Sequence, residues 1–206
     1  DNLKVMEHLS KTFRKILPNI NYTSKNIIKY KNKKKIKVIF ISEFFTNHTV
    51  GKLFKGLIEN ISRNKFEVVI FHTMNDENTL IKNEISKSAQ KIIILNEKIS
   101  VQQKQIENEN LDIIFYPDIG MSAKTYFLSF ARIAAVQIMS WGHPETTGIS
   151  TIDYFLSSIQ FEHDDKKKYS ESLVCLSQFP LYYKPPKNIR LTKIRKDFNL
   201  PDKSNL

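Results

Sequence analysis

The chain has 206 residues, 41% of them hydrophobic, with a single cysteine and a formal net charge of +11. This length suits one domain with a sizeable core, and no apolar run approaches the ~20 residues of a membrane span, so we expect no membrane partner. With Cys175 as its one cysteine, the sequence excludes a disulfide framework and a cysteine-based zinc cluster, and we expect a reducing, cytoplasmic setting.

The positive charge lies at the two ends of the chain. Residues 1–37 carry 11 Lys and Arg against 2 acidic residues, and residues 184–206 carry 7 against 2. The middle of the chain carries 14 basic and 17 acidic residues. A nucleic-acid groove needs positive charge across a folded face, interleaved with aromatic side chains, so this distribution argues against a nucleic-acid partner.

Residues 1–35 are expected to form an N-terminal helix and a basic linker. Apolar residues that recur every four positions predict an amphipathic helix over 3–17; they are Val5, Leu9, Phe13 and Leu17. Pro18 ends this helix. The segment from there to residue 35 is rich in Asn and Lys and has no periodicity, which is typical of a linker.

Residues 36–184 alternate between short runs rich in Ile and Val and longer helical patterns. The predicted strands are 36–41, 67–71, 91–95, 112–116, 136–140, 154–156 and 173–176. The predicted helices are 49–63, 78–89, 99–109 and 122–132. This alternation implies right-handed βαβ units, so we predict an α/β fold with a Rossmann-like, doubly wound and mostly parallel sheet. The basic tail, 185–206, is expected to be a partly helical linker.

Common cofactor signatures are absent from the sequence. No Gly-x-Gly-x-x-Gly follows the first strand and no Gly-x-x-x-x-Gly-Lys occurs, which argues against a dinucleotide cofactor and against a P-loop. The histidines show no metal-ligand spacing. We therefore expect neither a cofactor nor a metal site.

The turn at 42–49 follows the first strand and leads into a helix. The N-terminus of a helix presents free N–H groups that suit a phosphate or a developing oxyanion. His48 lies there, at the carboxyl edge of the sheet, and an imidazole can act as a general base near neutral pH. The alternative is that Asn47 or Thr49 caps the helix and that His48 is simply solvated.

The turn at 116–121 also follows a strand directly. Asp118 in this turn can serve as a hydrogen-bond acceptor that faces the same cleft as His48. The alternative is that Asp118 does no more than cap the following helix.

The loop at 141–148 uses two of the five glycines of the chain, Gly142 and Gly148. Glycine allows sharp turns and a close approach of the backbone to a ligand. Between the glycines, the loop offers an imidazole, two hydroxyls and backbone N–H groups for sugar or phosphate oxygens. The residues concerned are His143, Pro144, Thr146 and Thr147. The alternative is a rigid turn anchored by a buried Trp141.

These segments together resemble the catalytic core of the O-GlcNAc-transferase-like, or SPINDLY-type, protein glycosyltransferases. The pieces that carry the resemblance are SEFFTNH at 42–48, DIIFYPDIGM at 112–121, ARIAAVQ at 131–137, WGHPETTG at 141–148, IDYFLSS at 152–158 and YSE at 169–171. They follow one another in order across residues 36–206, which makes the resemblance far more specific than any single motif.

The resemblance implies the N-terminal half of a GT-B fold, in which two Rossmann-like halves face a cleft. It implies transfer of a sugar from a UDP-sugar to a protein side chain, with inversion and without a metal. In that family the second half holds most of the nucleotide. Residues 36–184 then form the N-terminal domain, and 185–206 leads toward a C-terminal domain that this chain lacks.

The resemblance also implies roles for residues of this half. His48 is the expected base or acceptor-orienting group, and Asp118 and His143 are expected to line the cleft. Thr146 and Thr147 are expected to support binding by hydrogen bonds. Half a cleft cannot hold both substrates in a reactive geometry, so we expect no transfer by this chain alone.

Two residues depart from the animal enzymes, which have Tyr in place of His143 and Gly in place of Glu145. The identities of the sugar and of the acceptor residue are therefore not carried over. The rival hypothesis is a non-catalytic Rossmann-like module that binds a protein partner.

Overall fold

The computed structural model describes residues 1–206 except 28–33, 74–77, 163–167, 185–191 and 202–206. Its strands are β1 Ile36–Ser42, β2 Phe66–Thr73, β3 Lys91–Leu95, β4 Ile113–Tyr116, β5 Val136–Met139, β6 Tyr154–Ser158 and β7 Ser172–Leu176. Its α-helices are α1 Asn2–Ile16, α2 Thr49–Asn60, α3 Leu80–Lys87, α4 Ile99–Glu107 and α5 Ala123–Leu128. Within the described residues, short 3₁₀ helices span Pro18–Ile20 and Arg195–Phe198.

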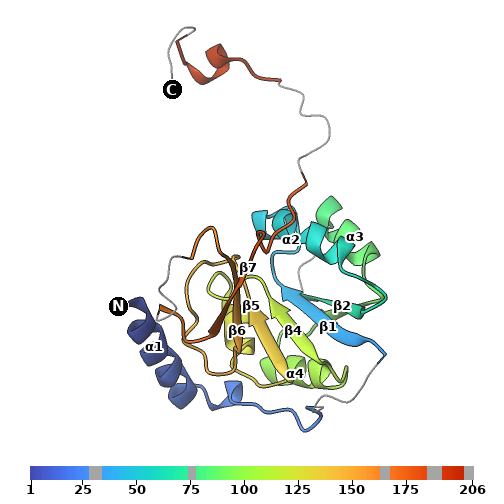
Figure 1. The fold of residues 1–206 in the computed structure, drawn as a ribbon, viewed down its shortest axis with the longest axis vertical. Helices are drawn as coiled ribbons and strands as arrows, with labels where there is room; N and C mark the ends of the chain where they lie inside the picture. Colours follow the sequence, from blue (N-terminus) through green and yellow to red (C-terminus); the bar gives the residue numbers. More distant parts are fainter. Residues whose placement is uncertain (28–33, 74–77, 163–167, 185–191, 202–206) are drawn as a thin grey trace.

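The seven strands form one sheet in the order β3-β2-β1-β4-β5-β6-β7, and every neighbouring pair is parallel (Figure 1). The predicted Rossmann-like, doubly wound fold is therefore confirmed. The runs of Ile and Val form strands because β-branched side chains pack well on a pleated surface that is buried on both sides.

Two apolar cores lie on opposite faces of the sheet. Along β1, Val38 and Phe40 belong to the core beneath α2 and α3, whereas Ile39 and Ile41 belong to the core beneath α4 and α5. This alternation follows from the two-residue period of a strand. Figure 1 shows α2 and α3 on one side of the sheet and α4 on the other.

Helix α5 ends four residues earlier than predicted, at Leu128 rather than at 132. The chain turns there because the backbone of Arg132 pairs with the N-terminal segment. Arg132 donates its N–H to the carbonyl of Tyr22, and Ser24 donates its own to the carbonyl of Arg132. This pairing with the N-terminal segment thus takes the place of the last predicted turn of α5.

The N-terminal helix is confirmed, but of its predicted apolar stripe only Phe13 packs against the core. Val5 is 56% exposed and Leu9 is 39% exposed. The buried side carries Ser10, and Phe13 packs edge-on against Tyr126 and Phe127. The backbone of the helix at Met6 lies against Gly148, and this close approach, rather than the apolar stripe, fixes the orientation of the helix.

The segment predicted as a linker packs against the body over its described residues. Ile20 is buried in the core, and Gln103 donates to the carbonyl of Asn19 over 3.0 Å. The N–H of Lys25 donates to the carboxylate of Glu107 over 2.8 Å. Residues 28–33 of this predicted linker lie outside the described part of the chain.

After β7 the chain crosses back over α2. The N–H of Tyr182 donates to the carbonyl of Leu53, and Gly56 leaves room for the Tyr182 ring, because an added Cβ would lie 2.1 Å from it. Much of the linker predicted at 185–206 lies outside the described residues. Within the described chain, no helix has the length and apolar character needed to cross a membrane.

Candidate functional site

The strand order places a topological switch between β1 and β4. From β1, the chain builds the sheet outward through β2 to β3 and then returns to build β4 to β7 on the other side. Doubly wound folds bind their ligands outside the carboxyl ends of the strands at such a switch. The three predicted site segments follow the neighbouring strands β1, β4 and β5 and so open at this edge. We call them the β1 turn (42–49), the β4 turn (116–121) and the β5 loop (141–148).

The β1 turn ends in a helix cap made by His48 itself. The ring Nδ1 of His48 accepts a hydrogen bond from the N–H of Val50 over 3.2 Å at the start of α2. The ring stacks on Phe44, with centroids 4.4 Å apart and planes 28° apart. The side chain is half-buried. The alternative in which Asn47 or Thr49 caps this helix is therefore wrong.

Asp118 is fully buried and joins the β4 turn to the β1 turn. Its Oδ2 accepts hydrogen bonds from the hydroxyl of Ser42 over 3.0 Å and from the N–H of Glu43 over 3.2 Å. Its Oδ1 has no hydrogen-bond partner among the described residues. Burial raises the pKa of Asp118 to about 7, and hydrogen bonds to the carboxylate, with that of Ser42 first among them, oppose this shift.

The capping alternative for Asp118 is also wrong, because Ser122 caps α5. The prediction that Asp118 binds a substrate stays a prediction. What its geometry establishes is a link between two turns that lie 75 residues apart in the sequence.

A second link between the same elements lies nearer the surface. The carboxylate of Glu43 accepts hydrogen bonds from Lys124 Nζ over 2.7 Å and from the hydroxyl of Ser122. Burial alone would raise the pKa of Glu43, but the Lys124 and Ser122 contacts hold it below the ordinary value. The β1 turn is thus held to the start of α5 by a charged contact as well as by Asp118.

The β5 loop lies directly on the β4 turn, and glycines make this possible. A Cβ added to Gly142 would lie 1.6 Å from the carbonyl oxygen of Pro117. Gly120 has a φ of +97°, and a Cβ added there would lie 2.5 Å from the His143 ring. The imidazole of His143 therefore rests over Gly120, half-buried at the edge of the sheet. Pro144, the next residue, is exposed.

The far half of the β5 loop is buried and anchored by Glu171. This carboxylate accepts the hydroxyl of Thr146 over 2.7 Å, the N–H of Thr147 over 2.9 Å and the hydroxyl of Thr147. A buried carboxylate needs such donors, and here it uses both hydroxyls. The two threonines therefore hold the loop, and their direct contact with a substrate stays a prediction.

Helix α1 supports the same loop from outside. Gly148 has a φ of +66°, and an added Cβ would lie 2.3 Å from the backbone of Met6. The side chain of Asn2 donates to Glu145 over 3.0 Å. The N-terminal helix is therefore part of the wall that positions the loop.

Trp141 opens an aromatic cluster at the carboxyl ends of β5, β6 and β7. The indole N–H donates to Ser157 over 3.1 Å, and the ring meets Phe161 and Phe179 at centroid distances of 4.6 and 6.0 Å. Trp141 is half-buried, whereas both phenylalanines are more than half exposed. Trp141 thus anchors the turn by packing, as the alternative interpretation of the loop expects, although its side chain is only half-buried.

A cavity of about 530 Å³ lies apart from the contacts of His48, Asp118 and His143. It opens between the end of α1 and the starts of α4 and α5, and its lining is largely apolar, with Leu17, Ile99 and Phe127 among the residues. In the described part of the chain, no three His, Cys, Asp or Glu side chains are grouped to hold a metal ion.

Residues 7–181 match the family model for glycosyl transferase family 41. This match covers well over half of the chain. The chain belongs to glycosyl transferase family 41. The resemblance to O-GlcNAc-transferase-like proteins that the sequence carries is therefore confirmed.

The chain spans 14–17% of the length of the curated relatives described here. The UDP-glucose:protein N-beta-glucosyltransferase of Actinobacillus pleuropneumoniae serotype 5b is 30% identical over 91 residues, which cover 44% of this chain and 14% of that protein. Two probable UDP-N-acetylglucosamine–peptide N-acetylglucosaminyltransferases of Arabidopsis thaliana are also similar. SEC is 27% identical over 69% of this chain and 15% of its own length, and SPINDLY is 26% identical over 73% and 17%.

A solved structure shares the fold. A mutant O-GlcNAc transferase of Thermobaculum terrenum superposes with a TM-score of 0.76 at 17% sequence identity. The match covers 87% of this chain and 35% of that one. At this identity the likeness concerns the fold alone.

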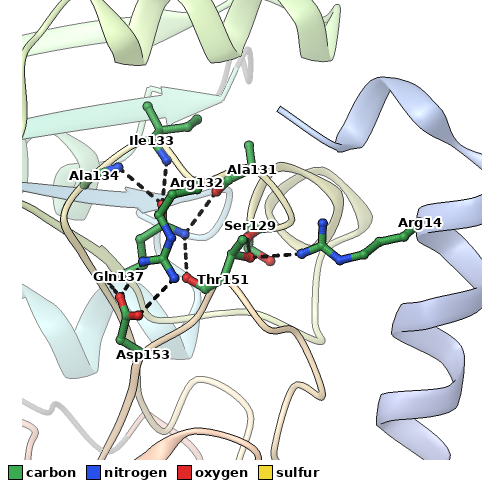
Figure 2. A network of polar contacts seen from close by, with 9 residues as sticks. All are labelled: Arg14, Ser129, Ala131, Arg132, Ile133, Ala134, Gln137, Thr151 and Asp153. Atoms are coloured by element: carbon green, nitrogen blue, oxygen red, sulfur yellow. Dashed lines mark hydrogen bonds and ion pairs between the residues drawn. The ribbon is translucent and has the colours of Figure 1, made fainter. Parts of the chain in front are cut away.

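Arg132, Gln137 and Asp153 form a network of polar contacts at the amino ends of β5 and β6 (Figure 2). Arg132 binds both oxygens of Asp153 over 2.6 and 2.9 Å, and Asp153 also accepts the N–H of Gln137 over 2.8 Å. The Gln137 amide in turn bonds the backbone of Ile133 and Thr151. These contacts fix the amino ends of β5 and β6, so two of the matching segments serve folding.

Sequence reasoning did not single out Ser42, Glu43 or Glu171 as members of the site. Each lies inside a segment that carries the family resemblance, which was the available signal. Their partners lie 24 or more residues away in the sequence, so no local pattern identifies them.

Proposed function

We propose that this chain forms the acceptor-side half of the catalytic core of a UDP-sugar-dependent protein glycosyltransferase. The observation that carries the proposal is the convergence of the β1 turn, the β4 turn and the β5 loop at the β1–β4 switch. Two half-buried imidazoles, His48 and His143, lie on these segments. The names of the relatives support a UDP-sugar donor and a protein acceptor.

The charge of the three segments favours the acceptor side over the donor side. Residues 42–49, 116–121 and 141–148 contain no Lys or Arg. Lys124, the cation at the start of α5, is paired with Glu43. A diphosphate is ordinarily held by Lys, Arg or a free helix N-terminus, and in the first turn of α2 the N–H of Val50 is already bonded to His48. The UDP moiety is then held by a second half, as in the GT-B arrangement that the family resemblance implies.

The reaction is a single displacement at the anomeric carbon, without a metal. The acceptor atom forms a bond to this carbon while the bond to the UDP oxygen breaks, and the configuration inverts. UDP leaves with the electron pair, and a base takes the proton of the acceptor. The role of this half is to hold the acceptor in line with the departing nucleotide, which lowers the entropic part of the barrier.

The test is a transfer assay with radiolabelled UDP-glucose and UDP-N-acetylglucosamine on whole-cell protein acceptors. It compares the longest protein that contains this sequence with the 206-residue chain. We expect transfer by the longer protein and none by the chain alone. His48→Ala in the longer protein should lower kcat/KM by about 100-fold or more, because it removes a positioned polar group from the edge.

Transfer by the 206-residue chain alone would contradict the assignment to one half of a core. Failure of every longer protein to transfer sugar, with protein binding retained, would favour the rival hypothesis of a non-catalytic binding module.

A further inference from the structure

The cavity of about 530 Å³ between the end of α1 and the starts of α4 and α5 has fixed walls. Gln103 donates to the carbonyl of Asn19 over 3.0 Å, which holds the 3₁₀ helix at 18–20 against α4. Phe127 meets Phe13 edge-on with ring centroids 5.2 Å apart, which joins α5 to α1. The cavity is therefore formed before any ligand enters it, as is usual for binding pockets.

The apolar residues of the lining run from the core of the protein to its surface. Ile20 is buried, whereas Ile16 is 61% exposed and Leu17 is 37% exposed. A ligand in the cavity would remove the apolar surface of Ile16 and Leu17 from water, and this removal favours binding.

The charged and amide groups of the lining give a polar ligand little to bind. The ammonium group of Lys124 is paired with Glu43 over 2.7 Å, and the amide of the buried Gln102 donates to the carbonyl of Asn96 over 2.6 Å. Among the described residues of the lining, Lys124 is the one cation, and Glu97 adds an exposed carboxylate. An anion would lose its hydration here without gaining a free cation, so the cavity favours a neutral, apolar group.

The cavity and the candidate site share a wall. Lys124 lines the cavity, and its Nζ contacts the carboxylate of Glu43 in the β1 turn. Ala123, which also lines the cavity, follows Ser122, and the hydroxyl of Ser122 reaches the same carboxylate. A ligand that crosses the start of α5 therefore passes from the β1 turn to the cavity.

We propose that this cavity is a subsite for the acceptor polypeptide and takes one of its large aliphatic or aromatic side chains. The inference rests on the proposed function, which places the acceptor residue beside the β1 turn. The apolar side chain belongs to a position at some distance along the same polypeptide, and it fixes how the polypeptide lies on the carboxyl edge of the sheet.

A side chain of a polypeptide suits this cavity better than a free apolar molecule does. The volume of about 530 Å³ falls in the range of ~300–1,000 Å³ that is typical of ligand pockets, but Ile16 and Leu17 leave part of the lining open to solvent. A free molecule depends on enclosure for its affinity. A side chain does not, because the main chain on either side of it supplies further contacts across the edge.

The first test compares paired peptides on the 206-residue chain by ¹H–¹⁵N titration. Each peptide carries an Asn, Ser or Thr and, at a set distance from it, a Phe or Leu; its partner has Ser in place of that Phe or Leu. We expect the Phe and Leu peptides to bind about 10-fold more tightly or better, and to shift amide signals of 97–102 and 123–127. Equal binding within the pairs at every distance would overturn the inference.

The second test fills the cavity. Ala123 is exposed, so Ala123→Trp adds a ring at the cavity wall without removing a core contact, and it should abolish the preference for Phe and Leu peptides. Asn83→Trp, at an exposed position of α3 on the other face of the sheet, is the matched control and should keep the preference. Thermal unfolding establishes that both variants are folded. A preference that survives in Ala123→Trp would place the apolar side chain elsewhere.

Failure of the subsite and failure of the proposed function give different results. If the longest protein that contains the sequence transfers sugar to both peptides of every pair with equal KM, the subsite is wrong and the proposed function stands. If it transfers sugar to no acceptor, both are wrong. Binding of free N-acetylphenylalanine amide at 97–102 and 123–127, without any difference within the peptide pairs, would assign the cavity to a small molecule and overturn the inference.

Discussion

Asp118 is buried although one of its oxygens lacks a partner among the described residues. The hydroxyl of Ser42 and the N–H of Glu43 satisfy only Oδ2. An ionised carboxylate in such a place is costly, and its pKa rises to about 7 for that reason. The carboxyl group that joins the β1 and β4 turns therefore changes its protonation state in the neutral range.

This pKa makes the stability of the chain depend on pH in a predictable direction. The folded state retains the Asp118 proton up to about pH 7, whereas an unfolded Asp releases it near pH 3.9. The stabilising contribution is complete below the lower value and is lost as the pH rises through the upper one. Asp118→Asn removes this titration. Urea unfolding should therefore show the wild type losing about 3 kcal/mol relative to the variant between pH 5 and pH 8.

The exposed carboxylate of Asp197 provides a matched control. Asp197→Asn should keep the pH dependence of the wild type. Parallel curves for Asp118→Asn and the wild type would mean that Asp118 is not the titrating group.

At the scale of elements, the β5 loop is held between β7 and α1. Glu171, which precedes β7, binds Thr146 and Thr147, and Gly148 lies against the backbone of α1. The loop thus depends on segments that lie both before and after it in the sequence. Its outer part, with the half-buried His143 and the exposed Pro144, therefore rests on a base that is held on both sides.

Glu171→Ala tests this anchoring. It leaves the buried donors of Thr146 and Thr147 without an acceptor, so the free energy of unfolding should fall by about 2–4 kcal/mol. Urea denaturation measures this change, and hydrogen exchange should show faster opening of residues 146–149. Glu162→Ala is a control of the same size at the aromatic edge, where the carboxylate accepts from Ser157 and Tyr169 and is not among the partners of Thr146 and Thr147. Equal exchange of the loop in both variants would contradict the anchor.

The elements themselves were largely predictable from the sequence, because runs such as 36–41 and 67–71 have the composition and length of buried strands. The face of α1 that packs against the body was not predictable. Its apolar residues Val5 and Leu9 predict burial, but the docking of Met6 on Gly148 is a contact across the whole chain. The positions of His48 and Asp118 at one edge followed from the strand pattern. Their hydrogen-bond partners did not, because a strand pattern does not specify which side chains meet across turns.

At the scale of the whole molecule, the described residues form one doubly wound parallel sheet whose carboxyl edge carries the candidate site. That edge carries two imidazoles, a buried carboxylate and an exposed aromatic cluster around Trp141, Phe161 and Phe179. Its three segments lack Lys and Arg. The absence of Lys and Arg from these segments supports the proposal that this edge faces a polypeptide rather than a diphosphate.

The most direct test of this account is to compare ligands on the 206-residue chain by ¹H–¹⁵N spectroscopy. One titration uses UDP, and the other uses a mixture of short peptides that contain Asn, Ser and Thr. The account predicts that the peptides shift amide signals of 42–49, 116–121 and 141–148, and that UDP leaves them unchanged at millimolar concentration. Shifts in these segments with UDP, and none with the peptides, would contradict the assignment of this chain to the acceptor side.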